Sequence, residues 1–369
     1  MSNSALFGTR QEALAVPTGT LDLAACPDCG FVQNRAFDPG LVSYDSANED
    51  SQAHSQRFID YARSMSRDLI SDHGLVGARA LEVGCGKGDF LRIFCQESGG
   101  SGVGMDPAVG PGALESPGER LELRAERFTG TTRTGADVIL CRHTLEHVAD
   151  VRAFVGEIAA AAVAESAVVF LEVPDVARVL AEGAFWDVYY EHCSYFTAES
   201  LEGLVAASGM KVVKCTNVYE DQYLALEAVA PSQAGEEQAR RQRFHTEQGE
   251  CVVSSARSFS AEVADLRAHW RRYIMSYKEN GDVVVLWGGG SKAVSFLSET
   301  GLGETVDAVV DVNPRKAGLY LPGSALPVVK PDVLTGLDPA AVVVMNPVYE
   351  DEIRADIQAM GLNSEVISI

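Results

Sequence analysis

The sequence predicts an α/β protein with two doubly wound units, and three observations lead to this fold class. Short apolar runs bounded by Gly, Asp or Pro recur over residues 74–232, with helix-like segments between most of them: ALEVG, GVGMD, ADVILC, AVVFLEVP and KVVKC. The pattern stops over residues 233–280 and returns over residues 281–369. In both units the opening run ends in a glycine-rich turn. Parallel βαβ units, buried on both faces, produce this pattern.

The chain divides into four expected segments. Residues 1–73 mix turn signals such as CPDCG and FDPG with a charged, helix-like stretch, which predicts a small accessory domain. Residues 74–232 form the larger α/β domain. Residues 233–280 have the charge density and apolar spacing of one or two amphipathic helices that link domains. Residues 281–369 contain DVVVLWGGG, VDAVVDVNP and AAVVVMNP, which predict a second, smaller α/β domain.

Composition and charge restrict the classes of partner. The formal net charge of -22 argues against nucleic acid and anionic membranes, because both would repel such a surface. No apolar run reaches the roughly 20 residues of a spanning helix, and the N-terminus does not resemble a signal peptide. The eight cysteines are scattered singly apart from one CPDC pair, as reduced thiols are. We therefore expect a cytoplasmic monomer or homodimer that acts on a small molecule.

The most informative motif is ALEVGCGKGDFL, at residues 80–91. An apolar strand ends near Glu82, and Gly84, Gly86 and Gly88 precede an amphipathic helix. Glycines are needed there because the turn takes positive φ and lets a ligand contact bare backbone and helix N–H groups. Asp106 ends the next strand, where its carboxylate can accept hydrogen bonds from ribose hydroxyls. This spacing fits S-adenosylmethionine (SAM) better than NAD.

A second glycine loop, WGGGSKAVSFL, formally matches a dinucleotide fingerprint. Gly288, Gly290 and Ala293 give G-x-G-x-x-A, and Asp311 follows at nearly the spacing of the first loop. A nicotinamide-dependent enzyme is therefore a rival interpretation. Only about 90 residues follow Gly281, a short length for a dinucleotide domain. We expect a structural or substrate-contacting unit instead.

Four motifs in this order carry a resemblance to a known family: LEVGCGKGDFL, CRHTLEHV, FWDVYYEHCSYFT and VVDVNPRKAGLYLPG. From about Cys26 onward the chain resembles the three-domain SAM-dependent C-methyltransferases that act on nucleotide-linked keto-deoxysugars. The resemblance implies a zinc-binding N-terminal domain, a class I methyltransferase domain with a Rossmann-like sheet, and a C-terminal Rossmann-like domain. The last of these helps to hold the nucleotide part of the substrate.

The resemblance implies a set of catalytic residues. C-methylation beside a ketone needs a base, and the pKa of His suits that role. The family's Tyr-x-Glu-His motif falls on Tyr189, Glu191 and His192, with His192 as the presumed base. Tyr44 matches a family tyrosine supplied by the N-terminal domain, and His147 matches a polar residue near donor and substrate.

The same resemblance extends the cofactor site. Arg142 and His143 follow the strand ADVILC, where class I methyltransferases place the methionine end of SAM. Glu126 and Arg127 lie in AERF, which matches the loop that the family uses beside the adenine. A pair of charged residues exposed to solvent, with no ligand, is the alternative explanation for Glu126 and Arg127.

Two departures from the family pattern concern the metal site and the substrate pocket. The family's zinc site uses two C-x-x-C pairs, and this sequence has only Cys26 and Cys29 in its N-terminal segment. Tetrahedral zinc needs four ligands, so no metal is expected unless a degenerate site persists. The segment YEDQYLALEA, at residues 219–228, stands where the sugar enzymes tend to have a glycine-rich hairpin. That difference predicts a remodelled substrate pocket.

The motifs together predict a SAM-dependent methyltransferase. The favoured reaction is C-methylation alpha to a ketone of a nucleotide-linked deoxysugar, or of a related metabolite, in natural product biosynthesis. O- or N-methylation of another small metabolite is the first alternative. A non-catalytic SAM-binding protein is the second.

Overall fold

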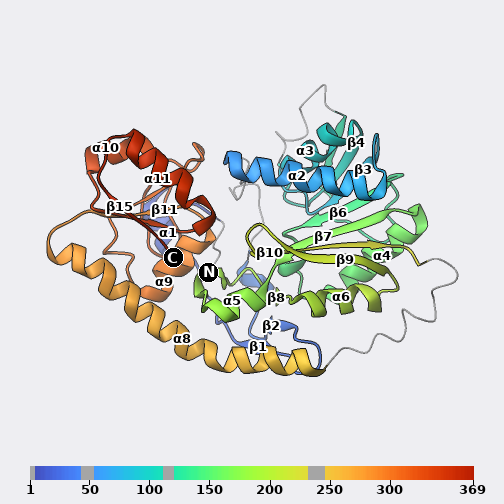
Figure 1. The fold of residues 1–369 in the computed structure, drawn as a ribbon, viewed down its shortest axis with the longest axis horizontal. Coiled ribbons are helices and arrows are strands. Elements are labelled where there is room, and N and C mark those ends of the chain that lie inside the picture. The colour runs from blue at the N-terminus through green and yellow to red at the C-terminus, as the bar shows by residue number, and fades with distance from the viewer. Residues whose placement is uncertain (1–4, 43–53, 111–119, 232–245) are drawn as a thin grey trace.

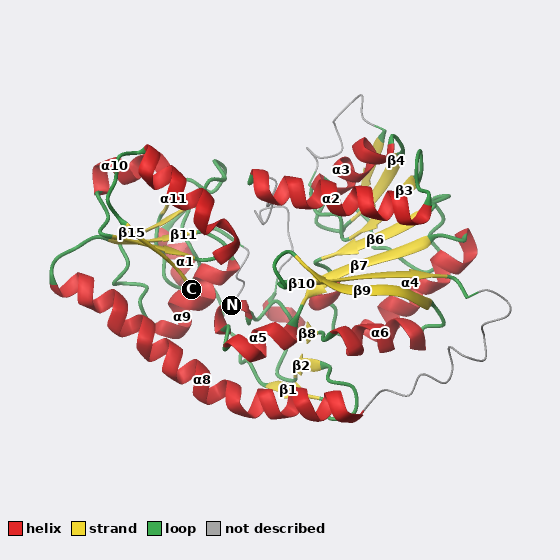
Figure 2. Cartoon of the chain, in the orientation of Figure 1, coloured by secondary structure: helices red, strands yellow, loops and turns green. Residues whose placement is uncertain are grey.

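The structure is a computed structural model, and it describes residues 5–42, 54–110, 120–231 and 246–369. Within these ranges no helix combines the length and the apolar character needed to cross a bilayer. Two sheets with their helices form two lobes, and a long helix runs beneath both of them (Figures 1 and 2).

The larger lobe contains a seven-stranded sheet in the order β5-β4-β3-β6-β7-β10-β9. The strands are β3 Arg79–Val83, β4 Ser101–Met105, β5 Leu121–Arg124, β6 Val138–Arg142, β7 Val168–Pro174, β9 Lys211–Val218 and β10 Tyr223–Val229. Strands β3 to β7 are mutually parallel, as the βαβ pattern predicts. β10 is antiparallel to both of its neighbours, because a short turn joins it directly to β9.

Successive residues of each central strand point to opposite faces, and both faces are covered. On β6, Val138 and Leu140 pack toward one core, and Ile139 and Cys141 pack toward the other. Helices α2 Gln56–His73 and α3 Asp89–Ser98 contribute to the first core, and α4 Val151–Glu165 and α6 Ala198–Ala207 contribute to the second. This two-sided burial explains the continuous apolar runs of the sequence.

The turn between β9 and β10 has an unusual backbone. Tyr219, Glu220 and Asp221 have φ angles of 54°, 54° and 60°. Three consecutive left-handed residues favour glycine, because a side chain there costs roughly 1–2 kcal/mol per residue. The same turn makes a contact between the lobes, since the Tyr219 hydroxyl donates to Tyr349 at 2.6 Å. The turn lies in the segment where the sequence departs from the glycine-rich pattern.

The smaller lobe contains a five-stranded, wholly parallel sheet in the order β13-β12-β11-β14-β15. Helix α9 packs on one face, and α11 packs on the other. The elements are β11 Val284–Trp287, α9 Ser291–Thr300, β12 Ala308–Val310, β13 Val328–Val329, α10 Leu334–Leu337, β14 Ala341–Val344, α11 Glu350–Ala359 and β15 Glu365–Ser368, with 3-10 turns η5 Pro331–Val333 and η6 Pro347–Tyr349. The sequence prediction of two Rossmann-like α/β units is confirmed.

The N-terminal segment contacts both lobes. Its hairpin, β1 Leu23–Ala25 and β2 Val32–Asn34, adds to β8 Ser194–Tyr195, so that Val32 lies opposite Tyr195. Its first part, with α1 Arg10–Leu14, pairs with the smaller lobe through Phe7 and Tyr320. The remaining short elements are η1 Pro39–Leu41, η3 Leu145–His147, α5 Val176–Glu182 and η4 Phe185–Asp187.

A single helix, α8, spans Thr246–Glu279. It packs against β1 and α5 at one end and against α9 and β11 at the other. Figure 1 shows it running along the base of both lobes. Apolar side chains such as Trp270 and Ile274 join the core shared with the smaller lobe. The helix therefore braces the two units on the side away from their cleft.

Candidate active site

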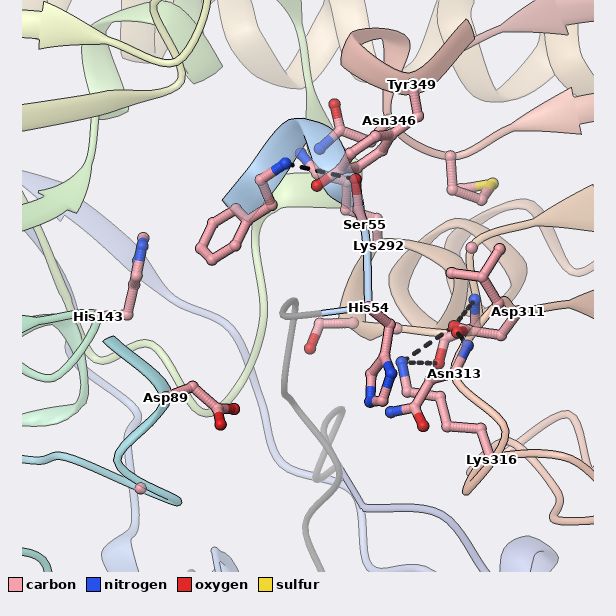
Figure 3. Close-up of a pocket in the computed structure, with 18 of the residues that line it drawn as sticks. His54, Ser55, Asp89, His143, Lys292, Asp311, Asn313, Lys316, Asn346 and Tyr349 are labelled. Atoms are coloured by element: carbon pink, nitrogen blue, oxygen red, sulfur yellow. Dashed lines mark hydrogen bonds and ion pairs between the residues drawn. The ribbon is translucent and has the colours of Figure 1, made fainter. Parts of the chain in front are cut away.

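A cleft of about 450 Å³ lies between the two lobes. Both glycine loops line it, the first from Gly84 to Lys87 and the second from Gly288 to Lys292. Figure 3 shows Asp89 and His143 on one side of the open space, with Asp311 and Lys316 on the other. Because the loops follow the carboxyl ends of parallel strands, both sheets direct their ligand-binding edges toward one cavity.

The first loop has the backbone that the sequence predicts. Gly84, Gly86 and Gly88 have φ angles of 73°, 50° and 76°. A Cβ at Gly84 would meet the Thr144 hydroxyl oxygen at 2.0 Å, whereas a Cβ at Gly86 would enter open space. The loop is thus packed against protein at its start and open at its centre, as a cradle for a ligand must be.

Two carboxylates hold the first loop in place. Glu82 accepts a hydrogen bond from the Leu91 backbone N–H at 3.1 Å and lines the cleft, and burial raises its pKa to about 8. Asp106 accepts from the Gly86 N–H at 3.0 Å and from the Ala108 N–H at 2.8 Å. These contacts leave acceptor positions on Asp106 for a ribose, because an ionised carboxylate offers about four.

Not all of the predicted cofactor residues face the cleft. Arg142 and His143 line it, together with Glu82, Gly84 and Gly86. Asp106, Glu126, Arg127 and Gly88 are not among its lining residues in the described part of the chain. Glu126 and Arg127 are both exposed on the loop after β5. The contact of these two residues with adenine stays a prediction.

A buried ionic network lies beside the first loop. Glu172 pairs with Arg142 at 2.6 Å and with His143 at 2.8 Å, and Tyr61 donates to its second oxygen at 2.5 Å. Burial favours the neutral acid, but Arg142 and His143 outweigh it and lower the pKa of Glu172 to about 2. Burial likewise opposes a charged His143, yet Glu146 and Glu172 raise its pKa to about 9. Both groups are therefore charged near neutral pH.

Three of the five predicted catalytic side chains lie on the wall of the same cleft. Tyr189, His192 and His147 all line it. The His192 ring lies 4.4 Å from the Tyr189 ring and 4.8 Å from the His147 ring, measured between centroids. His147 bonds through Nδ1 to the Glu191 carbonyl oxygen at 3.1 Å. Tyr44 lies outside the described residues.

His192 has the properties expected of a general base. Only 8% of it is exposed, and its Nδ1 has no hydrogen-bond partner among the described residues. Burial, together with His147, His143 and Lys292, lowers its pKa well below 6.5. A neutral imidazole is thus maintained at physiological pH, and an unpartnered nitrogen can accept a proton.

The other members of the motif have different positions. Glu191 is 1% exposed and is not among the cleft-lining residues of the described chain. Tyr189 donates its hydroxyl proton to Asp187 at 3.0 Å, and burial raises its pKa well above 10. Tyr189 therefore keeps its proton and presents a neutral phenol.

Glu146, His147 and His192 form a three-residue group with the side chains to hold a cation. One ligand atom of each lies within 4.8 Å of the others, and Oε2 of the buried Glu146 has no hydrogen-bond partner among the described residues. Cys26 and Cys29 lie in the turn between β1 and β2 as half-buried free thiols and are not part of this group. Burial raises the pKa of Cys29, which favours the thiol over a metal-binding thiolate.

In the second loop, the carboxylate of Asp311 is hydrogen-bonded to neighbouring groups of the same lobe. Asp311 Oδ2 accepts from the Gly289 N–H at 2.8 Å and from the Lys316 ammonium at 3.0 Å. Its Oδ1 accepts from the Asn313 N–H at 2.8 Å. In a dinucleotide site this carboxylate would bind ribose hydroxyls instead. Asp106 of the first loop has the same two backbone N–H contacts, so the Lys316 ammonium is what distinguishes Asp311 from it.

Two charged residues near the motif, the buried Asp187 and the half-buried Lys292, were missed by sequence reasoning. Asp187 stands within WDVYYEH itself, and Lys292 stands within GGGSK. Their side chains form an ion pair between the lobes. Asp187 and Lys292 are far apart in the sequence, so no sequence pattern indicates that they pair. The position of Asp187 within an apolar, aromatic run does indicate a buried acid that needs a partner.

The sheet order, the glycine cradle and the acid after the second strand define a class I SAM-dependent methyltransferase. Residues 34–215 match a family model described as "Methyltransferase domain", and residues 227–365 match one described as "C-methyltransferase C-terminal domain". C-methyltransferase NovU from Streptomyces niveus is 25% identical over 94% of this chain and 85% of its own length. The chain therefore belongs to the SAM-dependent C-methyltransferases that carry this C-terminal domain.

Other relatives match only part of the chain. An ubiquinone biosynthesis O-methyltransferase from Rhodopseudomonas palustris is 33% identical over 29% of this chain and 45% of its own length. A solved N1-methyltransferase for 1,6-didemethyltoxoflavin from Burkholderia thailandensis, with S-adenosylhomocysteine (SAH) bound, covers 48% of this chain and 82% of that one. It is 16% identical, with a TM-score of 0.38.

Proposed function

We propose that the protein methylates a carbon alpha to a ketone, on a nucleotide-linked deoxysugar or a related small metabolite, with His192 as the base. The observation that carries this proposal is the state of His192. It is buried, its pKa is lowered, and one of its nitrogens has no partner among the described residues. It also lines the cleft that contains the SAM loop.

The chemistry requires a neutral base and a protected carbanion. His192 takes the α-proton, and the electron pair left behind is shared between the carbon and the ketone oxygen as an enolate. SAM, when bound, would supply an electrophilic methyl group. The enolate carbon would bond to that methyl as the sulfur–methyl bond breaks, which leaves SAH. Aromatic side chains on the wall, such as Tyr189 and Tyr223, limit the access of water to the enolate. The proton remains on His192 until it is released to solvent.

The nucleotide part of the proposed substrate is supported by the extent of the cleft. It continues from His192 to the second loop, where Gly290 and Ser291, at the start of α9, line it. The start of a helix is a favourable place for a phosphate. A relative named as a C-methyltransferase matches the chain through both lobes. We infer that the ketone lies near His192 and that the larger group of the substrate extends toward the smaller lobe.

Methyl transfer from labelled SAM tests this proposal. The protein is incubated with a panel of dTDP-, GDP- and CDP-linked 4-keto-sugars, and the product is examined by NMR for a new carbon–methyl bond. The proposal expects at least one C-methylated product and none with His192→Gln. Intact SAM binding without transfer to any panel member would reject the nucleotide-sugar substrate.

O-methylation of another small metabolite is a second candidate. The local match to ubiquinone biosynthesis O-methyltransferases favours it, as does the non-glycine turn at residues 219–221, where Tyr219 contacts Tyr349 on the cleft wall. In that reaction His192 would deprotonate a hydroxyl group. A methyl resonance bonded to oxygen in the product would replace our first proposal with this one.

The group of Glu146, His147 and His192 allows a further check on the base. A metal bound to His192 would occupy the electron pair that must accept the proton. We expect turnover to survive a chelator that strips divalent cations. Loss of turnover, with recovery on adding back a cation, would assign His192 as a ligand.

A further inference from the structure

Asp187 receives three donors at the boundary between the lobes. Its Oδ1 accepts the hydroxyl of Tyr189 at 3.0 Å and is also paired with the ammonium of Lys292. Its Oδ2 accepts from Arg178 at 2.5 Å. Asp187 is 8% exposed and does not line the cleft, whereas Tyr189 and Lys292 do. The Asp187 carboxylate is therefore buried behind the side chains that line the cleft.

Lys292 occupies a costly place for a cation. It lies in the first turn of α9, where the helix dipole disfavours positive charge, and its side chain is only 17% exposed. Burial lowers the pKa of Lys292, against the effect of Asp187. Buried ion pairs contribute little to the net free energy of folding. A pair of this kind therefore indicates a role in fixing the positions of neighbouring side chains.

Tyr189 connects this pair to the base. Its ring is the nearest to His192 among the described aromatic contacts, at 4.4 Å between centroids. Because Nδ1 of His192 has no hydrogen-bond partner among the described residues, packing has a large part in orienting the imidazole. Fixing the Tyr189 hydroxyl therefore helps to fix the ring against which His192 packs.

We propose that Asp187 and Lys292 are positioning residues, which anchor the Tyr189 hydroxyl and so hold His192 in its reactive orientation. The inference rests on the proposed role of His192. It gives the smaller lobe a part in catalysis, because Lys292 arrives from α9 while Asp187 and Tyr189 belong to the larger lobe. Assembly of the base would then depend on the contact between the lobes.

A double-mutant cycle tests whether Asp187 acts through Tyr189. Asp187→Asn and Tyr189→Phe are each expected to lower kcat by about 10- to 100-fold with little change in SAM affinity. In the Tyr189→Phe background, Asp187→Asn should cost less than about twofold more. Effects that multiply in the double variant would overturn the proposal. SAH release serves as the assay.

Lys292 is tested with a conservative pair and a matched control. Lys292→Met should lower kcat as Asp187→Asn does, and Lys292→Arg should recover part of the loss because it restores the charge. Ser295→Ala removes another contact of α9 with the larger lobe, the 3.1 Å hydrogen bond to the Val188 carbonyl. It should leave kcat within about twofold of the parent protein. Equal losses in Ser295→Ala and Lys292→Met would contradict a specific role.

The two proposals can fail separately. A product methylated on oxygen or nitrogen rejects C-methylation but still permits the cycle, since SAH is released in either case. If no panel member turns over, ¹³Cζ-tyrosine NMR decides, with the Tyr189 resonance assigned by its loss in Tyr189→Phe. Lys292→Met should shift that resonance. An unchanged resonance would show that Lys292 does not support Tyr189.

Discussion

His192 shows how surroundings give a common side chain a particular role. A histidine in water is half-protonated near pH 6.5, but burial and the neighbouring positive groups keep this one neutral well below that pH. Asp187 shows the converse, since Lys292 and Arg178 lower the pKa of its carboxyl despite burial and so favour the charged form. At the scale of residues, the site therefore combines a neutral proton acceptor, His192, with charged side chains that hold its neighbours in place.

The pH dependence of kcat/KM follows from His192. Because its folded pKa is depressed, the base stays deprotonated as the pH falls through 6.5, and activity is lost only below its lowered pKa. We expect the acidic limb of the profile to lie below pH 6.5. In Lys292→Met that limb should move upward, since Lys292 contributes to the depression. A limb at or above pH 6.5 in the parent protein would contradict the assignment.

Asp106 provides a test of the SAM site. Asp106→Ala removes the acceptor for the Gly86 N–H and the proposed acceptor for the ribose. We expect SAM to bind about 10- to 100-fold more weakly, equivalent to roughly 1.4–2.8 kcal/mol. Calorimetric titration measures this directly. The exposed Glu126→Ala serves as a comparison, and equal losses in the two variants would show that the adenine loop contributes as much.

At the scale of elements, the prediction from sequence succeeded where periodicity is strong. The parallel strands and the first glycine loop have local signals, and both appear as expected. The antiparallel β10 was not foreseen, because an apolar run does not encode its direction. The turn before it gave no warning either, since Tyr219, Glu220 and Asp221 are not residues that favour positive φ as glycine does.

The strain in that turn can be measured. Glu220→Gly and Glu220→Ala both remove the exposed ion pair with Arg57, which is worth little. Only glycine relieves a φ of 54°, so Glu220→Gly should be more stable than Glu220→Ala by about 1 kcal/mol. Chemical denaturation compares them. Equal stabilities would show that the turn is relaxed.

The buried network on β6 and β7 predicts a pH-dependent stability. The folded pKa of His143 is raised to about 9, so its contribution is full below pH 6.5 and is lost as the pH rises through 9. Glu172→Gln removes the carboxylate that pairs with Arg142 and leaves His143 with Glu146 alone, so it should cost about 3–5 kcal/mol near pH 6.

The cost of Glu172→Gln should shrink by on the order of 2 kcal/mol at pH 9.5, where His143 is neutral in both proteins. Thermal unfolding of the parent and the variant at the two pH values measures the difference. A cost that does not change with pH would mean that His143 is uncharged in the folded protein.

At the scale of the molecule, both lobes face one cleft, and α8 braces them from the other side. The sequence predicted the two α/β units and the methyltransferase family. It brought together Tyr189 and His192, which are close in the chain. It could not predict that Lys292 reaches Asp187, because that contact depends on the arrangement of the lobes. The roles assigned to the individual site residues, Tyr44, Glu126 and Arg127 among them, stay predictions.

Proton exchange tests the central claim most directly. The protein is mixed in D₂O with SAH and the keto-sugar that it methylates, and NMR follows the α-proton. SAH cannot donate a methyl group, so any exchange reports removal of the proton alone. We predict exchange with the parent protein and none above background with His192→Gln. Undiminished exchange in His192→Gln, or none with the parent protein, would contradict a base at His192.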